Sequence, residues 1–158
     1  MAIDGVKIID SDTGYDIYNY VIGSYKDGVS VDKIVETMLA EEKDYCIDDF
    51  YSEIYWTALA YSLWKIGHLP DDVKEKTIGI IKKGADEFWL EIDGNALKQR
   101  QKYLDKLAIQ LENENPKPIK VPKSKTTRKP YFQTGDVLAI KFDDEYGVCF
   151  VSSVDEGP

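Results

Sequence analysis

The sequence has a single histidine, His68, and two cysteines, Cys46 and Cys149, which stand far apart along the chain. One histidine cannot supply a histidine-based metal cluster, and without a CxxC pair a zinc site is not expected. No pair of a nucleophile and a base can be named either. His68 fits the C-terminal end of a helix, where a cationic side chain is favourable. The sequence therefore predicts no metal, no cofactor and no catalytic residue, and it favours a protein that is not an enzyme.

Long apolar stretches are also missing. A membrane-spanning helix needs about 18 or more consecutive apolar residues, and no run in this chain approaches that length. The first residues, MAIDGVKIIDSD, lack the basic and apolar regions of a secretory signal. Two free thiols are typical of a reducing cytosol. We therefore expect a cytoplasmic protein.

Acidic residues outnumber basic ones except in one stretch. Residues 1–115 carry a net charge of −10, residues 116–130 carry +6, and residues 131–158 carry −5. An acidic body argues against a general nucleic-acid binder, because contact with phosphates needs clustered lysine and arginine side chains. The charge instead favours a basic partner, or serves solubility alone.

Helical periodicity covers most of the first 111 residues. Residues 50–66, FYSEIYWTALAYSLWKI, are apolar on nearly every side, with only Glu53 and Lys65 charged. A helix that is apolar all round is normally a central, buried one, and Gly67 suits the position after its C-terminus. The pattern predicts a mainly α fold, an irregular bundle of five to six helices. The other expected helices cover residues 10–25, 31–39, 70–84, 85–91 and 95–111.

The last part of the sequence changes character twice. Residues 116–130, PKPIKVPKSKTTRKP, contain four prolines, six cations and no acid, which predicts an extended linker. Residues 131–158 then read as two strands around the turn DDEYG. The expected organisation is a helical domain (1–115), a basic proline-rich linker (116–130) and a β-hairpin (131–158).

An isolated hairpin is marginally stable in water and needs cover. Three arrangements would supply that cover. The hairpin can pack on the helical body, pair with the hairpin of a second copy, or add strands to the sheet of another protein. We favour packing on the body, and a homodimer through the hairpin stays open.

Carboxylates gather in the junction EEKDYCIDDF, residues 41–50. Acid–base chemistry by paired carboxylates requires burial, and nothing in this stretch indicates burial. Two interpretations stay open: a solvated acidic surface, or an electronegative patch that receives a basic partner and speeds its association. Nearby tyrosines would anchor such an interface. The candidate partner-binding residues are Asp44, Tyr45, Asp48, Asp49, Tyr51 and Glu53.

The basic linker offers an alternative site for nucleic acid. Its cations are suited to phosphate contacts, although aromatic residues for base stacking are absent before Tyr131 and Phe132. The alternative nucleic-acid contacts are Lys120, Lys123, Lys125, Arg128 and Lys129.

Three parts of the chain carry a resemblance. The start, IIDSDTGYDIYNYV, is similar to the opening of uncharacterised bacterial proteins. ALAYSLWKIGHLPDDVKEKTIGIIKKGAD, followed by NALKQRQKYLDKLAIQLENENPKP, resembles a helical segment of uncharacterised bacterial proteins, in which a helix pair precedes a Pro/Lys linker and a β-rich C-terminal region. The stretch FQTGDVLAIKFDDEYGVCFV is similar to the first hairpin of immunity-protein-26-type domains, where a GDV strand opens a small barrel. Such a barrel needs about five strands, whereas this sequence has two. The resemblance implies a cytoplasmic partner-binding protein, an immunity protein or antitoxin, and supplies no catalytic residue.

The leading functional hypothesis is therefore a non-enzymatic inhibitor. We expect an immunity-like, antitoxin-like or phage-encoded protein that neutralises a partner, such as a nuclease-type toxin or a defence factor, through its acidic, tyrosine-rich surface. The alternatives are a nucleic-acid-associated regulator that uses the basic linker and the terminal strands, and an enzyme whose site is completed by a partner.

Overall fold

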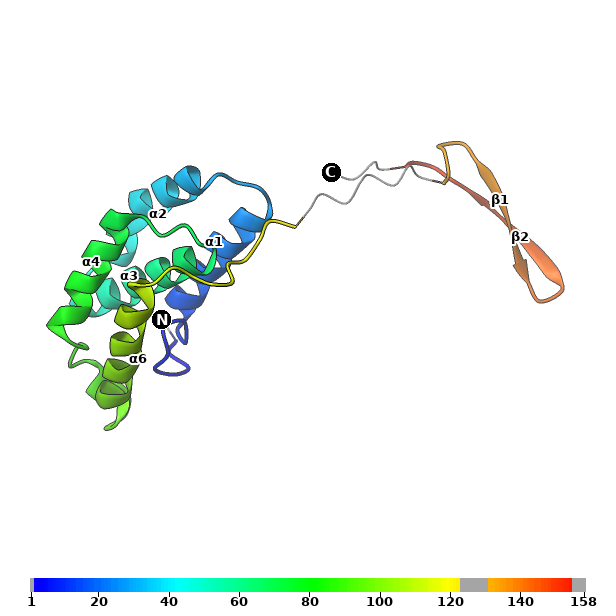
Figure 1. Cartoon of the computed structure of the whole chain (residues 1–158). Helices are drawn as coiled ribbons and strands as arrows, with labels where there is room; N and C mark the ends of the chain where they lie inside the picture. The colour runs from blue at the N-terminus through cyan, green and yellow to red at the C-terminus, as the bar shows by residue number, and fades with distance from the viewer. Residues whose placement is uncertain (1, 123–130, 155–158) are drawn as a thin grey trace. The chain divides into compact units, whose positions relative to one another are not determined.

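The structure described here is a computed structural model that covers residues 2–122 and 131–154. It divides into two compact units, Met1–Val121 and Pro122–Pro158, and each is described by itself. Six helices occur in the described residues of the first unit, and an antiparallel pair of strands occurs in the second (Figure 1). The predicted mainly α fold is therefore confirmed. The helices are α1 (Asp12–Lys26), α2 (Val31–Tyr45), α3 (Asp49–Lys65), α4 (Asp71–Lys83), α5 (Trp89–Ile92) and α6 (Ala96–Leu111).

Helix α3 is the centre of the helical unit, as its all-round apolar sequence predicts. Of its 17 residues, 11 are buried, and it packs against α1, α2, α4 and α6 (Figure 1). Because each neighbour buries one stripe against α3, those helices keep a polar outer face. The buried face of α1 is formed by Gly14, Ile17, Val21 and Ile22, whereas Tyr20 is 38% exposed.

Local side-chain and glycine chemistry fixes where the helices begin and end. Ser30 caps α2 by accepting a hydrogen bond from the backbone nitrogen of Lys33, a role for which serine is strongly preferred. After the C-terminus of α3, Gly67 adopts φ +76°. The Gly67 nitrogen donates to the Trp64 carbonyl, and the His68 nitrogen donates to the Leu63 carbonyl. These are the two bonds of a Schellman motif, which glycine permits without steric strain.

The chain after α6 returns to the end of α3. The Asn115 side chain donates to the carbonyls of Trp64 and Lys65, and the Ile119 nitrogen donates to the Lys65 carbonyl at 2.9 Å. A Cβ atom on Gly67 would lie only 2.9 Å from Pro118. The helical unit consequently extends past the expected boundary at residue 115, because the first residues of the proline-rich stretch satisfy the carbonyls at the C-terminus of α3.

The second unit contains β1 (Val137–Phe142) and β2 (Glu145–Phe150), joined by the two residues Asp143 and Asp144. Asp143 adopts φ 49°, a conformation that aspartate tolerates better than most residues. The return strand begins at Glu145, three residues earlier than the sequence suggests, because the tight turn brings Glu145 opposite Phe142. The predicted packing of this hairpin on the helical body stays a prediction.

Candidate functional site

The corner between α2 and α3 carries the predicted acidic residues on its surface. Asp44 lies in the last turn of α2, Asp48 is the N-cap of α3, and Asp49 is the first residue of α3; all three are exposed. Glu42 differs, because its carboxylate lies 2.6 Å from the Lys76 ammonium of α4. The structure therefore leaves the charges of Asp44, Asp48 and Asp49 facing solvent. We call these three residues, together with Tyr45 and Tyr51, the corner surface.

The two tyrosines of the corner surface are half-buried. The ring of Tyr45 stacks on that of Tyr55, with centroids 5.4 Å apart, and Tyr51 meets the ring of Phe50 edge-on at 5.7 Å. Burial raises the pKa of Tyr45, and the neighbouring charges of Glu41 and others add to the effect. Each tyrosine ring thus packs against another aromatic ring while part of it faces solvent. Partly buried aromatic rings of this kind commonly anchor protein interfaces.

Asp48 also has a structural role. Its Oδ1 accepts a hydrogen bond of 2.8 Å from the Tyr51 nitrogen and so caps α3. Replacing Asp48 with alanine is expected to lower the free energy of unfolding by about 1 kcal/mol. Asparagine, which caps equally well, should cost much less. Urea denaturation of the two variants checks this, and equal losses would contradict a capping role.

Glu53 does not belong to the corner surface. The prediction that Glu53 forms part of an exposed acidic surface is wrong, since its side chain is 2% exposed. The Nε of Arg100 donates to Glu53 Oε1 at 2.7 Å, and the indole nitrogen of Trp89 donates to the same atom at 3.2 Å. The Asp86 nitrogen donates to Oε2 at 2.9 Å. A buried carboxylate is tolerated because these donors compensate its charge.

Arg100 connects the Glu53 carboxylate to the segment before α1. Its Nη1 donates to the carbonyls of Lys7 at 2.8 Å and Val6 at 3.2 Å, and its Nη2 donates to Thr57 at 3.2 Å. The guanidinium lies 4.8 Å from the ring centroid of Trp89, within range of a cation–π interaction. Burial lowers the pKa of Arg100 and the Glu53 carboxylate opposes that change; the group stays protonated.

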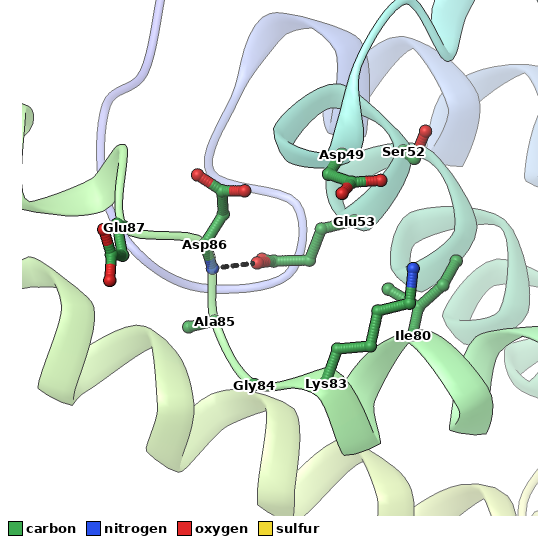
Figure 2. Close-up of a pocket in the computed structure, with 9 residues that line it drawn as sticks. All are labelled: Asp49, Ser52, Glu53, Ile80, Lys83, Gly84, Ala85, Asp86 and Glu87. Carbon is green, nitrogen blue, oxygen red and sulfur yellow. Dashed lines mark hydrogen bonds between the residues drawn. The ribbon is translucent and has the colours of Figure 1, made fainter.

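A cavity of about 250 Å³ lies between α3, the end of α4 and the loop before α5. Figure 2 shows Glu53 reaching from α3 toward the backbone nitrogen of Asp86, with Asp49 and Lys83 beside it. Carboxylates thus come from both sides of the cavity, and one cation stands among the lining residues. The lining residues are Asp49, Ser52, Glu53, Ile80, Lys83, Gly84, Ala85, Asp86 and Glu87.

The alternative nucleic-acid site is described only at its first residue. Lys120 is exposed, whereas Lys123, Lys125, Arg128 and Lys129 lie outside the described residues. Within residues 2–122 and 131–154, no cluster of His, Cys, Asp and Glu side chains is arranged to hold a metal ion. Across the same ranges, no helix combines the length and the apolar character that crossing a membrane requires.

Sequence reasoning missed Arg100 and the residues around α5. Arg100 occupies a position in the apolar stripe of α6, four residues before Leu104, where both are buried. A charge in such a stripe signals a buried partner, and Glu53 is the one acidic residue within the apolar helix α3 after its first turn. Together these two signals indicate an ion pair between Glu53 and Arg100. The sequence alone, however, does not show that α3 and α6 are neighbours.

Comparison of the chain with protein-family models, with curated proteins and with solved structures finds no match. The resemblance to immunity-protein-26-type domains consequently stays a prediction that rests on the quoted residues.

Proposed function

We propose that this chain is a non-enzymatic binding protein that neutralises another protein, in the manner of an immunity protein, an antitoxin or a phage-encoded inhibitor. The observation that carries the proposal is the corner surface, where Asp44, Asp48 and Asp49 are exposed beside two half-buried tyrosines. Exposed carboxylates steer a basic partner toward the surface, and partly buried aromatic rings supply contact area at little cost in conformational entropy.

The proposed class of partner follows from charge. A nuclease is basic where it holds its substrate, because that surface contacts phosphates. A nuclease-type toxin or defence factor therefore matches an acidic corner surface. A cytoplasmic location, where such a partner acts on nucleic acid, belongs to the same proposal.

The test is a pull-down with the tagged chain from a lysate of the organism that encodes it, with and without nuclease treatment, followed by mass spectrometry. We expect one protein to be captured in stoichiometric amount after nuclease treatment. The variant Asp48→Asn/Asp49→Asn removes two charges and keeps the α3 cap. Loss of those charges should reduce capture on the order of tenfold and flatten its dependence on salt.

The matched control is Asp71→Asn/Asp72→Asn, which removes the same two charges from the exposed start of α4. This variant should capture the partner as the unmodified chain does. Equal capture by both double variants would remove the corner surface from the proposal. Recovery of nucleic acid without any such protein would favour the regulator that acts through the basic linker.

A further inference from the structure

Helix α5 and its flanks expose apolar side chains that the fold does not cover. Phe88 is 46% exposed, Leu90 49% and Ile92 40%. Trp89, which lies between Phe88 and Leu90 in the sequence, is 1% exposed. The buried indole of Trp89 therefore anchors the segment, and the side chains on either side of it face outward. Phe88 and Ile92 are four residues apart and share one side of the turn.

The segment is firmly anchored despite its exposed side chains. Glu53 accepts hydrogen bonds from the Asp86 nitrogen and the Trp89 indole. The ring of Phe50 lies 4.7 Å from that of Phe88 and 5.2 Å from that of Trp89. Because the backbone and the central ring are already fixed, binding at this surface would cost little ordering entropy.

Carboxylates alternate with the exposed apolar residues along the sequence. Glu87, Glu91 and Asp93 are exposed, and none of them takes part in an ion pair among the described residues. No lysine or arginine occurs between residues 86 and 93. The three carboxylates lie within seven consecutive residues of the chain, so their like charges repel one another. We call these three carboxylates, together with Phe88, Leu90 and Ile92, the α5 surface.

We infer that the α5 surface is a docking site for a protein segment that carries both cationic and apolar side chains. The apolar side chains would cover Phe88, Leu90 and Ile92, and the cations would relieve the repulsion among the carboxylates. Nucleic acid and anionic membranes do not fit, because their phosphates would meet Glu87, Glu91 and Asp93. A second copy of the chain would bring the same carboxylates and so is opposed by like charge.

The inference rests on the proposed protein-binding function and extends it to a second surface. The two surfaces adjoin, because Asp49 and Glu87 line the same cavity of about 250 Å³, and Phe50 contacts both Tyr51 and Phe88. Asp49, Asp86 and Glu87 line this cavity together with one cation, Lys83, so a lysine or arginine side chain of the bound segment would meet more carboxylates than cations there.

The test uses the purified full chain and a synthetic amphipathic peptide built only from leucine and lysine at helical spacing. Backbone amide resonances are followed by NMR during the titration. We expect the largest changes at residues 84–93 and saturable binding. A scrambled peptide of the same composition, which lacks an apolar face, should bind on the order of tenfold more weakly.

A matched pair of variants separates specific docking from general attraction to an acidic chain. Glu91→Lys/Ile92→Ser alters the α5 surface, and Glu75→Lys/Ile109→Ser makes the same changes in composition at exposed positions of α4 and α6. We expect the first variant to weaken binding of the amphipathic peptide on the order of tenfold and the second to leave it within about twofold.

Equal weakening by both variants, equal binding of the scrambled peptide, or the absence of binding would overturn the inference. Those outcomes are distinguishable from failure of the proposed function. Suppose that Glu91→Lys/Ile92→Ser captures the lysate partner normally while Asp48→Asn/Asp49→Asn does not. The proposed role of the corner surface is then supported, and the α5 docking site is rejected.

Discussion

Replacing Arg100 with methionine is expected to lower the free energy of unfolding by about 3–5 kcal/mol. The substitution leaves the Glu53 carboxylate buried without its cation and the carbonyls of Val6 and Lys7 without their shared donor. Small domains have only about 5–15 kcal/mol of stability in total. The loss should therefore be plain in a urea denaturation curve as a lower midpoint with an unchanged slope.

Two further variants make this first prediction specific. Lys98→Met removes a charge from an exposed position of the same helix and should change stability by no more than about 0.5 kcal/mol. The double variant Glu53→Leu/Arg100→Met removes both charges and should recover part of the loss, because no unpaired charge is left buried. A cost for Arg100→Met no larger than that for Lys98→Met would show that the ion pair does not hold the fold.

Replacing Trp89 with alanine should cost about 3–5 kcal/mol. The indole is 1% exposed, packs against Phe50 and Arg100, and donates to Glu53, so truncation creates a cavity and removes a donor from a buried carboxylate. Trp89→Phe keeps most of the apolar volume and loses the donor, and should cost about 1–3 kcal/mol.

Hydrogen exchange should localise the effect of Trp89→Ala. The amides of residues 86–93 should lose protection before those of α3, because Trp89 is the buried side chain that fastens α5. Equal costs for the alanine and phenylalanine variants would mean that the ring contributes through its N–H alone, and that packing does not anchor α5.

The sequence predicts the helical architecture well because its signals are local. All-round apolarity identifies α3 as central, and Gly67 marks its end through a backbone conformation that glycine favours. Ser30 identifies the start of α2 for a similar reason, since capping needs only a side chain and a nitrogen three residues later. Each of these features is decided within a few residues of chain.

The candidate site is predicted only in part because its features depend on distant residues. Asp44, Asp48 and Asp49 are exposed as expected, since hydrophilic junctions between helices normally face solvent. Glu53 is only a few residues further along and is buried, because Arg100, 47 positions later, compensates its charge. The α5 surface was not predicted either, since aromatic residues in a short helix are ordinarily read as core.

The contacts of Arg100 also bear on the order in which the chain acquires its structure during synthesis. The residues whose carbonyls Arg100 binds lie 94 and 93 positions earlier, in the segment before α1, and that segment leaves the ribosome before α6. Until α6 emerges, the carbonyls of Val6 and Lys7 and the Glu53 carboxylate have no guanidinium to bind, so α1 to α4 are translated before the ion pair between Glu53 and Arg100 can form. The last helix of the bundle therefore completes the fold of the first residues, and translational pausing before α6 should prolong the exposure of the N-terminal segment to proteases.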